Sequence, residues 1–198
     1  MPVNSREAVS TPRELVPVSL PNERGLDNEI PEGAVVEALP VVIDSENFTP
    51  RLLALLSNSL VWRESRALRA RFGLGTNDWR VIAALAVGPG MSASEISEYI
   101  GMNKAIVSKS VNILTDGGLI VQAEVPGRAR PLYLTEAGAD MHDQMLPISM
   151  RGQEVILDGL SQSDIDRLNE LLRSLLSRAR DLQMGDTIDP ALEETEGV

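Results

Sequence analysis

The stretch SASEISEYIGMNKAIVSKSVNILTDGGLI, residues 92–120, decides the fold. It opens with a capping box, because Ser92 is followed three residues later by Glu95, whose side chain can reach back to the start of the helix. Gly101 ends this short helix, Asn103 can cap a second one, and a pair of glycines terminates the second. Two helices joined by a tight turn are typical of a helix-turn-helix motif.

The sequence before this stretch predicts two further helices. Thr49 can cap the first, Pro50 suits its first helical position, and leucines at helical spacing extend it to Phe72. The second starts at Thr76 or Asn77, covers DWRVIAALA, and stops where Gly88 is followed by a proline and another glycine. Two helices are therefore expected before the motif begins.

The sequence after the stretch predicts a β-hairpin and two more helices. The apolar runs Ile120–Val125 and Pro131–Thr135 are separated by a short segment with two arginines, so the hairpin would have a basic tip. Thr135 can cap the next helix, in which Pro147 predicts a kink or a break. Ser161 opens the last helix, whose apolar residues recur as in a coiled-coil seam: Ile165, Leu168, Leu172, Leu175, Ala179 and Leu182.

Charge separates a near-neutral domain from two acidic ends. Residues 1–47 are rich in proline and hold nine acidic and three basic residues, a net charge of −6, so we expect a disordered or loosely docked arm. Residues 181–198 hold six acidic residues and no basic one, which leaves 48–180 with 15 basic and 14 acidic residues. We place a domain at residues 48–183 and an acidic tail at residues 184–198. The formal charge of −11 therefore does not exclude a polyanionic partner.

The second helix of the motif has an apolar side and a polar side. This is seen when residues 103–116 are arranged around an ideal helix axis, with a rotation of about 100° per residue. The apolar side has three members: Val107, Val111 and Leu114. Lys104 and Lys109, the only lysines of the chain, lie at about −40° and +100° from Ser108. The arc between them holds short side chains: Ala105, Ser108 and Asn112.

This polar arc suits the major groove of DNA. Long cations on its two rims can reach phosphates, while short neutral side chains between them can approach base edges. Asn112 can pair with an adenine, Ser108 can bond to several bases, and Ala105 can touch a thymine methyl group. A solvated face of an amphipathic helix carries similar residues, so this helix taken alone leaves both interpretations open.

From Leu74 to Gly138 the sequence resembles the MarR family of winged helix-turn-helix transcription regulators. The matching pieces are LGTNDWRVIAALA, the stretch quoted at the outset, and GRARPLYLTEAG, and the flanking helices match as well. The resemblance implies a mainly α fold with a small β-hairpin. A winged helix-turn-helix DNA-binding lobe (about residues 74–138) would join a helical dimerisation region (about residues 48–72 and 139–183).

The resemblance also implies a DNA-binding surface. Five residues fall on recognition-helix positions: Lys104, Ala105, Ser108, Lys109 and Asn112. Arg128 falls on the wing arginine that is expected to enter the minor groove, and Arg130 on a frequently basic neighbour. The wing departs from the family at Pro126, where many members have an aspartate that orients this arginine.

The preferred function is therefore a homodimeric repressor that binds double-stranded DNA at a pseudo-palindromic operator. The family resemblance implies release by a small, aromatic or phenolic, effector, and the coiled-coil seam independently supports self-association. The ligand candidates are Trp62, Arg66, Trp79 and Met141, although Trp79 and Met141 also suit a core and Arg66 an ion pair. Three alternatives stay open: an activator of the same family without ligand sensing, a winged-helix module that mediates protein contacts, and a small-molecule-binding protein without regulatory output.

Other function classes find little support in the sequence. The chain has no cysteine, nucleophile–base pair or phosphate loop, so we expect neither an enzyme nor a cofactor. His142 stands near Asp140 and Asp143, but the three do not share one helix face, and a solvated surface is preferred to a metal site. No secretory signal and no apolar run of roughly 18 residues is found, so no membrane association and a cytoplasmic location are expected.

Overall fold

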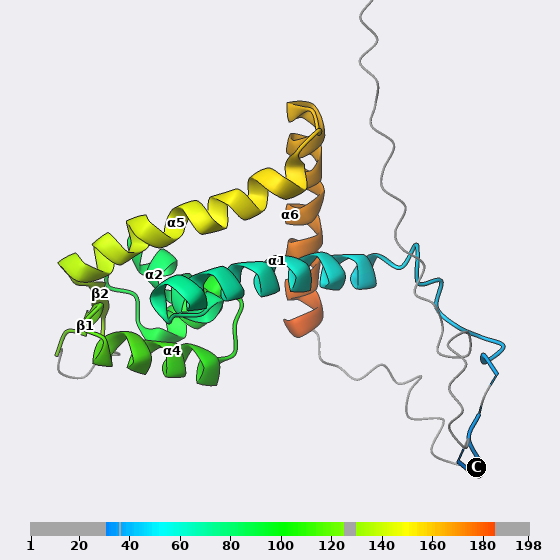
Figure 1. The fold of residues 1–198 in the computed structure, drawn as a ribbon, viewed down its shortest axis with the longest axis horizontal. Coiled ribbons are helices and arrows are strands. Elements are labelled where there is room, and N and C mark those ends of the chain that lie inside the picture. The colour runs from blue at the N-terminus through cyan, green and yellow to red at the C-terminus, as the bar shows by residue number, and fades with distance from the viewer. Residues whose placement is uncertain (1–30, 36, 125–129, 185–198) are drawn as a thin grey trace, which may run out of the picture. The chain divides into compact units, whose positions relative to one another are not determined.

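The computed structural model describes residues 31–35, 37–124 and 130–184. Their secondary-structure elements follow in this order: α1 (Thr49–Phe72), α2 (Thr76–Val87), α3 (Ala93–Ile100), α4 (Lys104–Asp116), β1 (Ile120–Gln122), β2 (Leu132–Leu134), α5 (Glu136–Leu157) and α6 (Gln162–Met184) (Figure 1). The fold is mainly α with a small β-hairpin, as the sequence predicts. The chain divides into two compact units, residues 1–152 and 153–198, and α5 crosses their boundary.

The core of the first unit is built around α2, which packs against α1, α3, α4 and β2. Trp79, Ile82 and Leu85 are buried on α2, because residues three apart lie on one face of a helix. Figure 1 shows α2 between α4 and α5. Apolar residues of the other elements complete the core: Leu68, Ile96, Val107, Val111, Leu114, Ile120, Leu132 and Met145.

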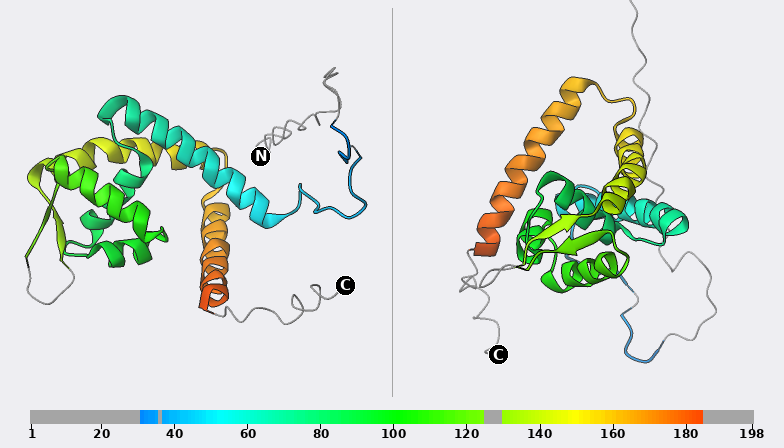
Figure 2. Two further views of the ribbon diagram at one scale, coloured as in Figure 1. Left: turned by 90° about the horizontal axis from the view of Figure 1, so that it is seen from below. Right: turned by 90° about the vertical axis from the view of Figure 1, so that its left-hand side faces the viewer.

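The β-hairpin is anchored at its base. β1 and β2 pair antiparallel, with Ile120 opposite Leu134 and Gln122 opposite Leu132. The backbone N–H of Leu132 donates to the carbonyl of Met91 (3.0 Å), and the N–H of Gly90 donates to the carbonyl of Leu132 (2.9 Å). The connection between α2 and α3 therefore adds hydrogen bonds to β2, and Figure 2 shows the hairpin projecting from this base.

The predicted start of α1 is wrong by one residue. Thr49 is the first helical residue, and Phe48 holds the N-cap position without a side-chain hydrogen bond. The carbonyl of Phe48 accepts from the N–H groups of Arg51 (3.0 Å) and Leu52 (3.2 Å). Pro50 has no N–H group to leave unsatisfied at this end, so the helix begins without a capping hydroxyl.

Of the two outcomes predicted at Pro147, a kink or a break, the break does not occur: α5 is continuous through this residue. A proline inside a helix removes one backbone hydrogen bond and crowds the preceding turn. Packing on both sides of Pro147 holds the helix together. Met145 is fully buried, and the hydroxyl of Ser149 donates to the carboxylate of Glu64 in α1.

The start of α5 is joined to the end of α4. The Thr135 hydroxyl lies 2.8 Å from the carbonyl oxygen of Gly118 and 3.2 Å from that of Leu119, and it accepts from the N–H of Gly138 (3.0 Å). Thr135 therefore caps α5, as predicted. A Cβ atom on Gly138 would lie 1.9 Å from the carbonyl oxygen of Leu119, so this close approach requires glycine.

Exposed apolar side chains are frequent on α1 and on α6. In α1, all of which is described, Leu68 is the one buried residue, and four leucines are 38–46% exposed: Leu52, Leu53, Leu55 and Leu56. In the described part of the α6 seam, Leu168 and Leu175 are 38% and 41% exposed. Both helices therefore carry apolar surface that could be covered by another chain.

The segment before α1 is exposed as well. Val35, Leu39 and Val41 are 62–87% exposed, so the apolar stretch at residues 34–43 does not dock on the domain within the described residues. None of the described helices is long and apolar enough to cross a membrane.

Candidate nucleic-acid interface

The helix-turn-helix predicted from residues 92–120 is present as α3, a tight turn and α4. Gly101 has φ +64°, a left-handed conformation that favours glycine, and it ends α3. In the turn, the N–H of Met102 donates to the carbonyl of Ser97 (3.0 Å), and the Ser97 hydroxyl donates back to the carbonyl of Met102 (2.5 Å). The side chain of Asn103 then accepts from the N–H of Ala105 (2.8 Å) and caps α4. These local bonds fix the angle at which α4 leaves the turn.

The capping box of α3 is formed as predicted. The N–H of Glu95 donates to the Ser92 hydroxyl oxygen (3.3 Å), while the carboxylate of Glu95 accepts from the N–H (2.7 Å) and the hydroxyl (2.8 Å) of Ser92. The bond from the backbone N–H, and after it the bond from the hydroxyl, lowers the pKa of Glu95 below its ordinary value. Its contribution to stability is therefore present above the ordinary pKa and is lost as the pH falls through the lowered one.

We expect Ser92→Ala to lower the free energy of unfolding by about 1 kcal/mol at neutral pH, as loss of an N-cap generally does. The pKa of Glu95, followed by NMR titration, should rise part of the way to its ordinary value, because the backbone N–H bond stays. Ser94→Ala, an exposed change in the same turn, is the matched control and should alter neither quantity. An unchanged Glu95 pKa in Ser92→Ala would contradict this account.

The inner side of α4 holds the helix against the core. Val107, Val111 and Leu114 are buried, as the angular plot predicts. Ser110 is also buried, at 3% exposure, and its small side chain permits close packing. The orientation of α4 about its own axis is therefore set by burial, and the opposite side must face outward.

The predicted polar arc of α4 is exposed over its whole width. All five of its predicted DNA-contacting residues face solvent in this chain: Lys104, Ala105, Ser108, Lys109 and Asn112. Among the described residues, neither lysine has a carboxylate partner. Asp116 lies on the same arc, at its C-terminal end, and is likewise exposed. The two lysines can bind the phosphates of a polyanion such as DNA. The short side chains between them leave room for the base edges to approach the helix.

The sequence interpretation missed two apolar residues on the outer surface of α4. Ile106 and Ile113 are 42% and 41% exposed. On an ideal helix they lie at about +160° and +140° from Ser108, just beyond Lys109. Their spacing in the sequence therefore already indicated a second, apolar strip on this helix.

The base of the wing is described, but its tip is not. Arg130 precedes β2 and is exposed, and its Nη1 donates to Oε1 of Gln122 in β1 (3.5 Å). Arg128 and Pro126 lie outside the described residues, so the predicted contact of Arg128 with DNA and the effect of Pro126 stay predictions. The structure thus brings Arg130 to the hairpin that follows α4 directly.

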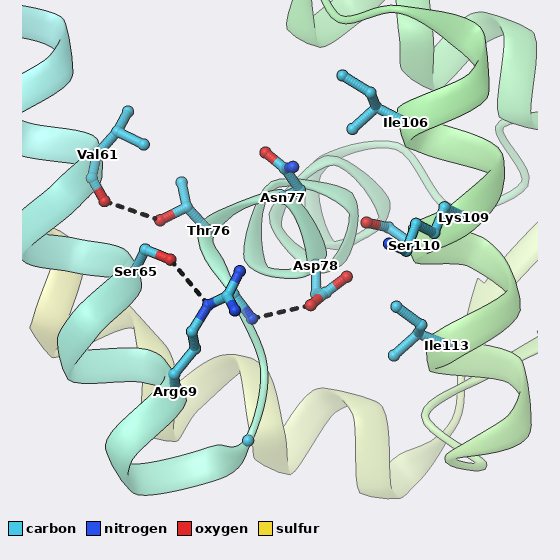
Figure 3. A pocket seen from close by; sticks show the side chains of 12 residues that line it. Val61, Ser65, Arg69, Thr76, Asn77, Asp78, Ile106, Lys109, Ser110 and Ile113 are labelled. Atoms are coloured by element: carbon cyan, nitrogen blue, oxygen red, sulfur yellow. Dashed lines mark hydrogen bonds between the residues drawn. The ribbon is translucent and has the colours of Figure 1, made fainter.

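A pocket of about 440 Å³ lies behind the polar arc, between α1, the turn that follows it, and α4 (Figure 3). Figure 3 shows Lys109 and the two isoleucines on the α4 side, opposite Arg69 and Thr76. The residues that line it are Val61, Ser65, Arg69, Gly73, Gly75, Thr76, Asn77, Asp78, Ile106, Lys109, Ser110 and Ile113.

Most polar groups of this pocket are held in place by hydrogen bonds. Nε of Arg69 donates to the Ser65 hydroxyl (3.2 Å), and the hydroxyl of Thr76 donates to the carbonyl of Val61 (3.4 Å). The buried carboxylate of Asp78 accepts from the N–H of Gly75 (2.8 Å). Pocket groups held in one position bind a ligand without the cost of ordering them.

The four ligand candidates chosen from the sequence lie in different environments, and none is among the residues that line this pocket. Trp62 is 72% exposed and Arg66 is exposed, both on α1. Trp79 is 6% exposed, and Met141 packs against the core. Their proposed contact with a ligand stays a prediction.

His142 belongs to a ring stack. Its imidazole lies 5.4 Å from the Trp79 ring, at an interplanar angle of 29°, and its Nδ1 lies 2.9 Å from a carboxylate oxygen of Asp143. Within the described ranges, no group of three or more His, Cys, Asp or Glu side chains could hold a metal ion.

Comparison with known proteins identifies the same architecture. Residues 72–131 match the sequence model of the MarR family. A MarR/EmrR family transcriptional regulator from Acinetobacter sp. ADP1 is 25% identical, with a TM-score of 0.66, over 70% of this chain and 99% of that one. A MarR family regulator from Silicibacter pomeroyi is 20% identical, with a TM-score of 0.62, over 67% of this chain and 90% of that one.

A further similar structure is the PcaV transcriptional regulator from Streptomyces coelicolor in complex with its natural ligand. It is 20% identical, with a TM-score of 0.61, over 70% of this chain and 99% of that one. No curated protein matches the chain significantly by sequence.

Proposed function

We propose that the chain is a homodimeric transcriptional repressor, because residues 72–131 match the sequence model of the MarR family. It would bind a pseudo-palindromic operator through α4 and the wing, and a small effector would release it. The observation that carries the proposal is the polar arc of α4. Its two lysines are exposed and unpaired among the described residues, and they bracket side chains short enough to approach base edges.

The apolar surfaces of α1 and α6 support self-association. Leu168 and Leu175 of α6 lie on a seam with alternating steps of three and four, which is the pattern of helices that pack against partner helices. A two-fold dimer would present two copies of α4 to successive major grooves, about 34–36 Å apart along the DNA. The operator would accordingly consist of two half-sites with inverted symmetry.

Effector release is supported by the pocket beside α4 and by a structural relative. The PcaV regulator was solved with its natural ligand, so this fold can bind a ligand in at least one protein. The pocket of the present chain lies next to the proposed DNA-binding helix. A ligand that binds better to a dimer unable to contact both half-sites would shift the population away from DNA.

Operator binding is the direct test of this proposal. Full-length protein is titrated against its own promoter region and against random DNA of equal length, with fluorescence anisotropy as the readout and several salt concentrations. We expect tighter binding to the promoter region and a steep decrease of affinity with salt. Equal affinity for both DNAs at moderate salt would contradict the regulator and leave a protein-interaction module as the better interpretation.

Asn112→Ala should mainly relax sequence preference. If Asn112 pairs with an adenine edge, its loss costs about 1–3 kcal/mol of discrimination at that base pair and leaves the salt dependence unchanged. Competition binding with a set of single-base operator variants measures the discrimination at each base pair. Ser174→Ala, an exposed change on α6 away from the polar arc, is the control. Uniform weakening on all DNAs by Asn112→Ala would argue against a base contact.

A further inference from the structure

α1 carries an exposed stripe on the side that faces away from the core. We call it the outer stripe, and all five of its members are exposed in the single chain: Leu52, Leu55, Ser59, Trp62 and Arg66. On an ideal helix they lie within about 80° of one another, and the buried Leu68 lies about 160° from their centre. Trp62 is 72% exposed, the highest value among the large apolar side chains of α1. A tryptophan exposed beside leucines indicates a surface that another protein segment covers.

The charge of α1 suits an acidic segment. The helix holds five arginines and one glutamate, a net charge of +4. Arg66 lies in the outer stripe, and Arg63 borders it at about 60° from its centre. Within the described ranges, neither of these two arginines has a carboxylate partner. A segment that carries both apolar and acidic side chains could therefore bury the leucines and pair with the arginines.

The arm that precedes α1, residues 31–48, has this complementary composition. It contains no basic residue and four acidic ones, a net charge of −4: Glu32, Glu37, Asp44 and Glu46. Large apolar side chains lie between these acids and are 62–87% exposed: Val35, Leu39, Val41, Val42 and Ile43. Apolar side chains that one chain leaves in water gain stability when a second surface covers them.

Hydrogen bonds tie the end of the arm to the start of α1. The carboxylate of Asp44 accepts from the N–H of Glu46 (3.1 Å) and from Nδ2 of Asn47 (2.7 Å). Nη1 of Arg51, in the first turn of α1, donates to the carbonyl of Ser45 (2.8 Å). The arm is therefore anchored at one end, while its own chain covers neither its apolar residues nor the outer stripe.

The arm is long enough to cover the outer stripe of a second copy. From residue 35 to residue 48 an extended chain reaches about 43 Å, at roughly 3.3 Å per residue. From Leu52 to Arg66 the stripe is about 21 Å long, at roughly 1.5 Å per helical residue. About half of the arm could therefore follow the whole stripe, and the rest could bridge from one copy to the other.

We propose that the arm of one protomer lies along the outer stripe of α1 in a second copy of this chain. Its apolar residues would cover Leu55 and Trp62, and its carboxylates would pair with Arg63 and Arg66. The proposal rests on the homodimer of the proposed function, because two-fold symmetry makes the exchange of arms reciprocal. Apolar burial would supply most of the stability, and the charge pairs would fix the register.

The absence of cysteine from the chain permits a direct test by cross-linking. Full-length Val41→Cys/Ser59→Cys is oxidised with diamide, separated on a non-reducing gel, and mapped by mass spectrometry after trypsin digestion. We expect a covalent dimer in which position 41 of one chain is joined to position 59 of the other. Neither single variant should form it.

The matched control replaces Ser59→Cys by Ser94→Cys, at an exposed serine of α3 outside the stripe. This control should give only the background of chance collisions. A disulfide between positions 41 and 59 of the same chain would place the arm on its own α1 and overturn the proposal. Cross-linking no stronger than in the control would overturn it as well.

Exposure of Trp62 and the strength of the dimer provide a second test. Trp79, the other tryptophan, is buried, so acrylamide quenching of the fluorescence reports mainly on Trp62. Val41→Asp/Ile43→Asp should increase this quenching, and in sedimentation it should raise the dimer dissociation constant about tenfold, because charges would enter an apolar contact. Val87→Asp, at a 70% exposed position of α2, is the control and should change neither quantity.

The results distinguish failure of the arm from failure of the proposed function. If the arm variant keeps the quenching and the dissociation constant of the wild type, the exchange of arms is wrong, while the dimer and its preference for promoter DNA stand. If the wild type sediments as a monomer at all concentrations, the homodimer of the proposed function is itself wrong, and the exchange of arms fails with it.

Discussion

Gly138→Ala is expected to lower the free energy of unfolding by about 3 kcal/mol, the upper part of the range for overpacking a core. The added Cβ would lie 1.9 Å from the backbone carbonyl oxygen of Leu119, and a backbone atom cannot rotate away as a side chain can. Relief of the clash requires α5 to separate from the end of α4. That movement would also break the bonds of Thr135 to Gly118 and Leu119. Urea unfolding monitored by circular dichroism measures the loss.

The matched control lies in the same helix. Gly152 is buried too, but a Cβ there would meet Nη1 of Arg63 at 3.6 Å and Cδ2 of Leu60 at 3.8 Å, which are ordinary contacts with flexible side chains. Gly152→Ala should therefore be neutral or stabilise by up to about 1 kcal/mol, since alanine favours the helix over glycine. Equal destabilisation by both substitutions would show that the close approach at Gly138 is not the cause.

The double variant Lys104→Ala/Lys109→Ala is expected to lose operator affinity by about three orders of magnitude at about 0.15 M salt. In a dimer the two lysines would make four phosphate contacts, and counterion release makes each contact worth roughly fivefold at this salt concentration. The slope of log K against log salt should become less steep by about 3.6, which is four times about 0.9. Anisotropy titrations over a range of salt give both quantities.

Arg173→Ala is the control for the loss of a positive charge. Arg173 is exposed on α6, in the second unit of the chain, and it lies beside the seam rather than on it. This substitution should leave the salt slope within about 0.5 of the wild-type value, because no phosphate contact is removed. If the double lysine variant keeps the wild-type slope, α4 does not contact the DNA backbone in the proposed way.

Most of the helix-turn-helix could be predicted because its signals are local. Ser92 and Glu95 cap α3 across three residues, Gly101 ends it, and Asn103 caps α4 across two. Hydrogen bonds of such short range depend little on the rest of the fold. The exposed arc of α4 followed from helix periodicity in the same way. The contact of this arc with DNA stays a proposal.

Errors and omissions arose where distant residues decide the outcome. Pro147 predicts a kink or a break when only its own segment is considered, and the break is avoided because the packing of Met145 and the bond between Ser149 and Glu64 keep α5 continuous. The pocket was missed for a similar reason. Its walls join Val61 to Ile113, more than fifty positions apart, and no spacing within one helix reports such a pair.

By itself the sequence determined the order of the helices, the caps of α3 and α4, the hairpin, and the position of both lysines on the outer arc of α4. Capping, turn formation and helix periodicity act over a few residues, so short stretches of sequence are enough to predict these features. Tertiary structure alone decided that Gly138 must lie against Leu119 and that Lys109, unlike Lys104, also lines a pocket. Both depend on how separate elements pack, because only packing brings groups from distant parts of the chain within contact distance.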